Sequence, residues 1–250
     1  MRRGARICPK SCFYQRVDGS NPVSHKPTMA LVTGASGFIG SNLVRVLLES
    51  GVRVRALVEP GLGTENLNGL ALEQVLGDRR DPQALTVAVN GCHTVYHQAA
   101  ILAYWLPQPA DLCRVNVEGT VHKLQAAKQA GVRRFVHGGS VASLGTLPGE
   151  ALADENTTFN NWDTADDYTL SKYVAELEAF RCDSPDLEVV AGLPTCTFGR
   201  YDIHPTPTGQ LAQRYVFGDN RTVFTGGFNC VKVKDVAVAL QLCATRGRPG

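Results

Sequence analysis

Two hydrophobic patterns alternate along most of this chain. Runs of four to seven mostly apolar residues are typical of strands buried in a parallel sheet, and longer stretches with apolar residues three and four apart are typical of helices that cover it. Their alternation predicts an α/β fold, a doubly wound parallel sheet of the Rossmann type. Strands are expected over residues 29–32, 52–58, 72–76, 94–97, 134–137 and 187–191, and helices over 39–47, 82–89, 111–130, 168–182, 208–217 and 235–244.

The periodicity also divides the chain. Residues 1–28 hold proline, glycine and arginine without any helical or strand period, and we expect a mobile basic tail. It is either an upstream extension or a targeting peptide, and the missing amphipathic period favours the extension. Residues 29–192 are expected to form the dinucleotide-binding Rossmann domain. Residues 193–250, where the alternation loosens, are expected to be a partial, apparently truncated C-terminal substrate lobe whose last helix returns to the Rossmann core.

Composition and charge narrow the class of protein. The chain is 44% hydrophobic and 19% charged, as in ordinary globular proteins. Of the net charge of +2, the tail carries +5 (six Lys or Arg against one Asp), which leaves −3 for residues 29–250 and no basic footprint for nucleic acid. Eight scattered cysteines and the lack of any apolar run near the ~20 residues of a membrane span predict a cytoplasmic protein without a metal site or a membrane span.

A glycine turn follows the first predicted strand. Gly34, Gly37 and Gly40 stand between that strand and the first helix. Glycines at this spacing let the backbone approach a pyrophosphate, while the helix N-terminus presents free N–H groups and the positive end of its dipole. Because a strand precedes the turn and a helix follows it, we expect a bound dinucleotide.

The end of the second strand bears on the choice of cofactor. Glu59 stands where a reader of the adenosine ribose is expected, and a carboxylate there accepts from the ribose hydroxyls and repels a 2′-phosphate. Glu59 therefore favours NAD over NADP as cofactor. The alternative is that Glu59 is a solvated loop residue before Pro60.

Other candidates follow later strands. Small residues after His97 allow a cofactor to lie close, whereas His97 itself is interpreted as a core histidine with satisfied nitrogens. Ser140 directly follows the fifth strand and should point at the crevice between cofactor and substrate. Tyr168 and Lys172 share one face of a helix at i and i+4, a pair that often occurs by chance but gains weight behind this serine and the glycine turn. Asn116, within a buried helix, needs a backbone partner in a neighbouring loop or strand.

Together these motifs resemble a known family. The sequences TGASGFIG at 33–40, HQAA at 97–100, NVEGT at 116–120 and YTLSK at 168–172 resemble the extended short-chain dehydrogenase/reductase superfamily of the NAD-dependent epimerase/dehydratase type. The likeness covers about residues 29–250. Within this superfamily the run 199–209 and the strand end SVASLG are most similar to hopanoid-associated sugar epimerases and dihydroflavonol reductase-like proteins.

The resemblance implies a catalytic set. Its members are Ser140, Tyr168 and Lys172, with Asn116 in support. A free tyrosine has a pKa near ~10, so a nearby ammonium would have to lower it to make Tyr168 the acid/base. The candidate cofactor-binding residues are Gly34, Ser36, Gly37, Phe38, Ile39, Glu59, Asp78, Arg79, Gln98, Ala99, Ala100, Tyr168, Lys172 and Pro194.

The chain departs from these relatives in three places. Glu59 replaces the usual arginine reader of the NADP phosphate. Before Ser140 the chain has His137-Gly138-Gly139, without the hydroxyls that relatives carry, so Ser140 is the candidate and Ser143 the fallback. Relatives also continue well past the equivalent of Gly250, and we expect a C-terminally truncated copy.

The expected function is that of an NAD(P)-dependent epimerase or reductase acting at a hydroxyl or carbonyl carbon of a sugar nucleotide or a small carbonyl compound. A small-molecule substrate is its expected partner, and a homodimer is left open. The alternative is a dinucleotide-binding regulatory or scaffold protein without turnover. Candidate pocket walls, although such loop residues are more often plain surface, are Tyr104, Trp105, Asp202, His204 and Arg214.

Overall fold

The computed structural model describes residues 28–77, 81–149, 151–218, 227 and 229–250. The predicted tail, apart from Thr28, and the candidates Asp78 and Arg79 lie outside these residues. Among the described residues, no helix is both long and apolar enough to cross a membrane.

A six-stranded parallel sheet forms the centre of the molecule. Its strand order is β3-β2-β1-β4-β5-β6, which reverses direction beside β1 and confirms the doubly wound Rossmann fold. Neighbouring strands pair in parallel throughout, so the carboxyl ends of β1 and β4 lie side by side at the switch point. The strands are β1 (Met29–Thr33), β2 (Arg53–Val58), β3 (Glu73–Leu76), β4 (Thr94–His97), β5 (Arg134–Gly138) and β6 (Glu188–Gly192).

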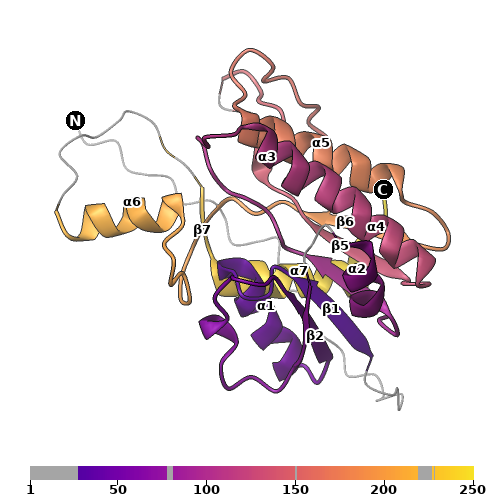
Figure 1. Ribbon diagram of the computed structural model, residues 1–250. Coiled ribbons are helices and arrows are strands. Elements are labelled where there is room, and N and C mark those ends of the chain that lie inside the picture. The colour runs from indigo at the N-terminus through magenta and orange to yellow at the C-terminus, as the bar shows by residue number, and fades with distance from the viewer. Residues whose placement is uncertain (1–27, 78–80, 150, 219–226, 228) are drawn as a thin grey trace, which may run out of the picture.

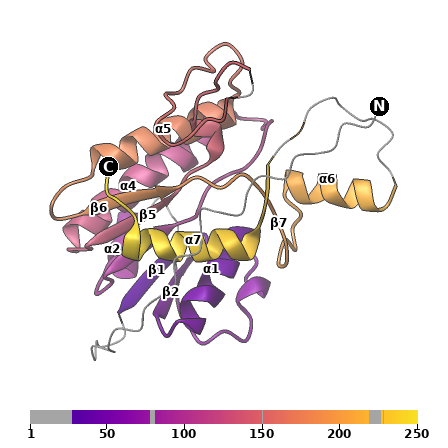
Figure 2. The same ribbon diagram turned by 180° about the vertical axis from the view of Figure 1, so that it is seen from behind.

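Helices cover both faces of the sheet (Figures 1 and 2). On one face α1 (Phe38–Glu49) packs along α7 (Val233–Arg246), and on the other α4 (Gly119–Gln129) packs between α2 (Pro82–Val89) and α5 (Asp167–Arg181). Pro82 occupies the first turn of α2, where its missing N–H costs nothing, and Asp81 caps that helix. The predicted helices are thus present within a few residues of their expected ends.

Alternation along the strands creates two hydrophobic cores. On β1 Ala30 and Val32 belong to the core under α1 and α7, whereas Leu31 belongs to the core under α2, α4 and α5. All three are at most 2% exposed. Full burial of a Leu or Val side chain contributes roughly 1.5–3 kcal/mol, which explains why strands buried on both faces are almost continuously apolar. The same alternation places Thr33, two residues after Leu31, on the α4 side.

The long predicted helix over 111–130 contains a local distortion. The structure shows α3 (Ala110–Leu112), a π-helix over Cys113–Glu118, and then α4. A π-helical turn inserts one extra residue, shifts the side chains that follow around the axis and often marks a functional site. Asn116 lies in this turn.

Beyond β6 the chain forms a small second sheet. Strand β7 (Cys196–Phe198) pairs in parallel with β8 (Cys230–Lys232), and α6 (Pro207–Val216) lies apart from the main sheet in both views (Figures 1 and 2). No residue of α6 is buried. Strand β7 was not among the expected elements, because three residues are too few to show a period of two. Residues 219–226 and 228, which precede β8, lie outside the described part of the chain.

Candidate active site

The glycine turn after β1 is a close-packed cradle. Gly34 has φ +68°, and a Cβ atom on it would lie 2.7 Å from the backbone nitrogen of Ala99. A Cβ on Gly40 would lie 2.0 Å from the carbonyl oxygen of Gly34. Position 34 requires glycine because of its backbone conformation and because the loop after β4 lies against it. Position 40 requires glycine because the first turn of α1 packs directly against the glycine turn.

Helix α1 begins with unsatisfied donors. Gly37 is its N-cap residue, no side chain caps the helix, and its first turn holds no acidic residue. The orphan N–H groups of the first turn and the dipole together form an anion site. Phe38 and Ile39 stand in this turn, and the side chain of Ile39 packs against the core.

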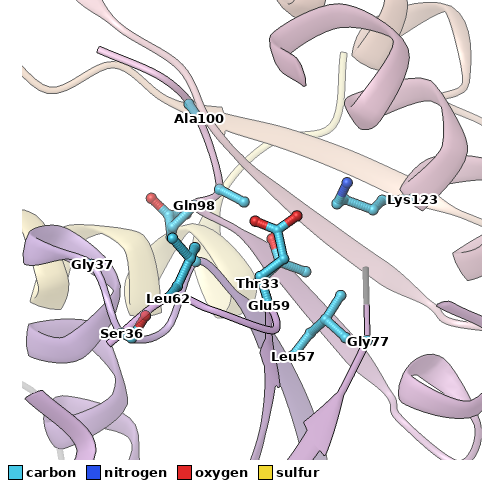
Figure 3. A pocket seen from close by; sticks show the side chains of 12 residues that line it. Thr33, Ser36, Gly37, Leu57, Glu59, Leu62, Gly77, Gln98, Ala100 and Lys123 are labelled. Atoms are coloured by element: carbon cyan, nitrogen blue, oxygen red, sulfur yellow. The ribbon is translucent and has the colours of Figure 1, made fainter. Parts of the chain in front are cut away.

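A cavity of about 170 Å³ opens beside this turn (Figure 3). It joins the glycine turn to the ends of β2, β3 and β4. The Nε2 atom of Gln98 is buried there without a partner among the described residues. The lining residues are Thr33, Gly34, Ser36, Gly37, Leu57, Glu59, Leu62, Gly77, Gln98, Ala99, Ala100 and Lys123, so seven of the expected cofactor-binding residues come together.

Sequence reasoning missed part of this wall. Lys123 belongs to it although its side chain is only 1% exposed, and its Nζ donates to the carbonyl oxygen of Gly119 at 2.9 Å. Figure 3 shows Lys123 on the side away from Gly37. A lysine in a helical stripe gives no sequence signal that it faces a pocket. Thr33, directly before Gly34, could have been found from its place at the strand end.

The residues present fit a dinucleotide. A backbone cradle that a Cβ atom would fill, an uncapped helix N-terminus and a buried amide nitrogen without a partner among the described residues all suit a ligand with a pyrophosphate and hydrogen-bonding rings. The carboxylate of Glu59 lines the same cavity. Glu59 is half-buried at this cavity, and its role as the ribose reader, against that of a solvated loop residue before Pro60, stays a prediction.

A second group of residues lies where β5 ends and α5 begins. The Tyr168 side chain is hydrogen-bonded to Ser140, whose Oγ also accepts from the backbone N–H of Ala142 at 3.2 Å. Burial raises the pKa of the Tyr168 phenol, the hydrogen bond with Ser140 opposes the rise, and Tyr104 and Asp166 add to it. The ring of Tyr104 meets that of Tyr168 edge-on at 6.1 Å. Tyr168 is therefore a protonated phenol at neutral pH.

Lys172 is anchored beside this pair. Its Nζ donates to the carbonyl oxygen of Gly138 at 2.6 Å, and the residue is 3% exposed. Burial lowers the pKa of Lys172 to about 8, against an opposing effect of Glu176. The expectation that Lys172 lowers the pKa of Tyr168 is wrong for this structure, because desolvation of the phenol dominates and the ammonium is held by Gly138.

Asn116 joins the π-helical turn to two neighbours. Its Oδ1 accepts from the backbone N–H of Ile101 at 2.8 Å, and its Nδ2 donates to Ile101 O at 3.1 Å and to Ser171 Oγ at 3.0 Å. The expected backbone partner of this asparagine is thus the loop after β4. Through Ser171 it also contacts the helix that carries Tyr168.

Ser143, the alternative to Ser140, makes different contacts. Ser143 Oγ lies 2.7 Å from Ser140 O and 2.6 Å from a carboxylate oxygen of Glu176. Burial raises the pKa of Glu176, while the Ser143 hydroxyl and Lys172 lower it. Since Ser143 contacts Glu176 and Ser140 contacts Tyr168, the geometry favours Ser140 as the residue that faces a substrate.

Other candidates take structural positions. Pro194 O accepts from the backbone N–H of Val141 at 3.3 Å, next to Ser140, and Pro194 does not line the cavity of Figure 3. Asp202 accepts from the N–H of Thr206 and so organises the start of α6. His97 is 2% exposed with both ring nitrogens hydrogen-bonded, as expected for a core histidine.

Comparison with known proteins identifies the family. A sequence model of the NAD dependent epimerase/dehydratase family matches residues 30–249. The chain belongs to this family. It is 37% identical over 229 residues to a protein of Synechocystis sp. named "Putative dihydroflavonol 4-reductase", an alignment that covers 90% of the chain and 66% of that protein. The chain thus spans just under two thirds of this relative.

Solved structures of similar proteins share the fold. The crystal structure of gox2253 superposes with a TM-score of 0.84 at 38% identity, over 90% of the chain and 68% of gox2253. The UDP-glucose 4-epimerase of Thermus thermophilus, in complex with NAD, superposes with a TM-score of 0.74 at 25% identity, over 87% of the chain and 74% of the epimerase. The family is NAD(P)-dependent and acts on small molecules.

Proposed function

We propose that this protein is an NAD(P)-dependent reductase of a carbonyl compound, with Tyr168 as its proton donor. The observation that carries the proposal is the group formed by Ser140, Tyr168 and Lys172 at the carboxyl edge of the sheet that also holds the glycine cradle. Ligands of doubly wound sheets bind at this edge. The relatives' names, a reductase among them, support the same class.

The cradle residues would hold the dinucleotide. The N–H groups at the start of α1 suit its pyrophosphate, and Glu59 suits the ribose hydroxyls of the adenosine half. When bound, NAD(P)H supplies the hydride that reduces a carbonyl carbon. A carboxylate in this cavity repels an additional phosphate, which favours NAD over NADP.

The remaining residues handle the proton. Because burial raises the pKa of Tyr168, its phenol carries the proton that a reduced carbonyl oxygen needs. Ser140, hydrogen-bonded to that phenol, orients the same oxygen. Lys172, fixed on Gly138 O, ties α5 to the end of β5 and so holds Tyr168 beside Ser140.

An epimerase is the second candidate. The NAD complex of the Thermus thermophilus epimerase shares the fold over 87% of this chain, and epimerisation uses the same kind of acid/base without net consumption of cofactor. The two candidate activities give different results in one assay. A reductase oxidises NADH in proportion to product, whereas an epimerase inverts its substrate at constant NADH.

The test is to incubate the protein with NADH or NADPH and a panel of ketones, aldehydes and UDP-glucose, and to follow absorbance at the nicotinamide band and product by mass spectrometry. Tyr168→Phe should lower turnover by about 100-fold or more and leave the dinucleotide dissociation constant within about threefold. Tyr215→Phe, on the exposed α6, is the matched control and should behave as the unchanged protein.

Each result decides between the candidates. Inversion of UDP-glucose without NADH loss would replace the reductase by the epimerase. Dinucleotide binding without turnover on any substrate, with the same dissociation constant in Tyr168→Phe, would support the regulatory or scaffold protein instead. Turnover that survives Tyr168→Phe would exclude Tyr168 as the proton donor.

A further inference from the structure

A chain of buried hydrogen bonds begins at the cofactor cavity. Thr33, which lines the cavity, has its Oγ1 2.7 Å from Nδ1 of His97. Nε2 of His97 lies 3.0 Å from Oγ1 of Thr120, and the Thr120 hydroxyl donates to the carbonyl oxygen of Asn116 at 2.6 Å. All four residues are at most 2% exposed. The chain thus runs from β1 through β4 into the π-helical turn without contact with bulk water.

The chain continues to the catalytic helix. The Asn116 side chain donates to Ser171 Oγ at 3.0 Å, and the Ser171 hydroxyl donates to the carbonyl oxygen of Tyr168 at 2.7 Å. Thr33 and His97 can begin this path because their side chains point to the sheet face that α4 and α5 cover. Leu31 and Val95, two residues earlier on the same two strands, belong to the core on that face. The route joins the cofactor cavity to the first turn of α5.

The positions of the protons follow from the acceptors. A carbonyl oxygen cannot donate, so the one proton of the Thr120 hydroxyl is committed to Asn116 O. Thr120 Oγ1 can then only accept from His97, which places the imidazole proton on Nε2. His97 Nδ1 is the acceptor that remains, and the Thr33 hydroxyl donates to it. The donors of Thr33, His97 and Thr120 therefore all point toward Asn116. The Asn116 side chain, which also donates to Ile101 O, and then the Ser171 hydroxyl continue the path to the backbone of Tyr168.

The surroundings of His97 keep this order fixed. Burial lowers the pKa of His97 well below its usual value, and the charges of Lys123 and Lys172 and the neighbouring His137 act in the same direction. The imidazole is therefore neutral, with one N–H and one acceptor nitrogen, and each has a single partner. Hydrogen bonds aligned in one direction polarise and strengthen one another, and a buried network with every member satisfied specifies one geometry.

We infer that Thr33, His97 and Thr120 are positioning residues: their directed hydrogen-bond chain, passed on by Asn116 and Ser171, fixes where Tyr168 stands relative to the cofactor cavity. None of the three has to touch a substrate. The inference rests on the proposed role of Tyr168 as proton donor. It assigns to His97 a function beyond that of a core residue of β4.

The test compares Thr120→Val with Thr120→Ser in the full chain. Valine keeps the shape but removes both the acceptor for His97 and the donor to Asn116 O, whereas serine keeps both. The readout is the pKa of Tyr168, from ¹³C-tyrosine NMR on NAD-loaded protein with the signal assigned by Tyr168→Phe. We expect a shift of about half a unit or more in Thr120→Val, and a turnover number lowered roughly tenfold or more with an NADH dissociation constant within about threefold. Thr120→Ser should match the unchanged protein.

Thr197→Val is the matched control. Thr197 is also a buried threonine whose hydroxyl donates to a backbone carbonyl, that of Thr195 at 3.0 Å, but it lies on β7 outside the chain of hydrogen bonds. It should lose stability without any shift in the Tyr168 signal. If Thr120→Val does not fold, Thr120→Ala against Thr120→Ser applies the same comparison without the extra methyl group.

The outcomes separate this inference from the proposed function. A folded Thr120→Val protein with an unchanged Tyr168 pKa and turnover number would overturn the positioning role, as would an equal shift in Thr197→Val. The NMR readout needs no substrate. A protein that reduces none of the test carbonyls but shows the Thr120→Val shift would therefore overturn the proposed reductase activity and still support the chain of hydrogen bonds.

Discussion

The ammonium of Lys172 donates a hydrogen bond of 2.6 Å to the carbonyl oxygen of Gly138 and thereby ties α5 to the end of β5. Ser140 follows two residues after Gly138, and Tyr168 precedes Lys172 by one helical turn. This one bond therefore sets the distance between the two segments that supply the catalytic group. The bond requires the Lys172 ammonium to be almost completely buried, and this burial lowers the pKa of Lys172 to about 8.

The first prediction concerns the pH dependence of stability. Since the pKa of Lys172 is about 8 in the folded protein and ~10.4 in an unfolded chain, the unfolded state binds more protons between these values, and stability rises with pH there. Below pH 8 both states are protonated and the penalty is constant. From pH 7.5 to 9.5 the free energy of unfolding should rise by about 2 kcal/mol more in the unchanged protein than in Lys172→Met, measured by urea denaturation.

Lys128→Met provides the control for this measurement. Lys128 is exposed near the end of α4, so its removal should leave the slope of stability against pH unchanged. Equal slopes for the unchanged protein and Lys172→Met would show that the ammonium is not desolvated as the structure indicates.

The second prediction concerns the glycine cradle. Gly34→Ala should destabilise the protein by more than Gly51→Ala, although both glycines have positive φ, +68° and +77°. Backbone strain costs roughly 1–3 kcal/mol at either site, but only at Gly34 does the added Cβ meet backbone atoms, at 2.7 Å, while none lies within 4 Å of Gly51. Gly34→Ala should also weaken NADH binding measured by fluorescence, and Gly51→Ala should not. Equal losses of stability in both variants would mean that backbone strain alone explains why position 34 requires a glycine.

Much of this fold could be predicted from the sequence because burial leaves a periodic trace. Leu31 and Val32 face opposite cores, and such two-sided burial produces the apolar runs from which the six strands were predicted. The π-helical turn at Asn116 leaves no such trace, since its extra residue is stabilised by tertiary bonds to Ile101 and Ser171. Strand β7 is too short for any period.

The candidate site shows the same division. Ser140 and the glycine turn were proposed because they stand at strand ends, and Tyr168 because it shares a helix face with Lys172. The family resemblance implied that Ser140, Tyr168 and Lys172 form one catalytic set. Lys123 was missed because a lysine on a helix is ordinarily solvated, and only the packing of α4 reveals that it is buried against the cavity. The direction of the Tyr168 pKa was also wrong, because desolvation depends on how the surrounding loops pack.

The third prediction concerns the choice of cofactor. Glu59 lines the cavity, and its charge should oppose the 2′-phosphate of NADP. In Glu59→Gln the ratio of the NADPH to the NADH dissociation constant should fall by about tenfold, equivalent to ~1.4 kcal/mol. Glu65→Gln, an exposed acid in the 3₁₀ turn over Glu65–Leu67, removes the same charge outside the cavity and should leave the ratio unchanged. A Glu59→Gln ratio equal to that of Glu65→Gln would assign cofactor choice to other residues.

The last prediction concerns the loop that follows β7. Tyr201 has φ +73°, and its ring lies 3.6 Å from the guanidinium carbon of Arg45. Asn66, which is 4% exposed, holds this loop against the glycine turn, since its Nδ2 lies 3.0 Å from both Ser36 O and Tyr201 O. A left-handed conformation at a tyrosine is costly and persists only where surrounding contacts impose it.

Asn66→Asp should therefore release this loop. The change replaces a donor to two carbonyl oxygens by a carboxylate that cannot donate, and it should lower the free energy of unfolding by about 2 kcal/mol or more. Because Ser36 lines the cofactor cavity, NADH binding should weaken in the same variant. Asn68→Asp, an exposed asparagine two residues later, is the matched control for added charge, and urea denaturation and NADH fluorescence should find it unchanged. Loss of stability without loss of NADH affinity in Asn66→Asp would show that the loop is fastened to the Rossmann core but does not shape the cavity.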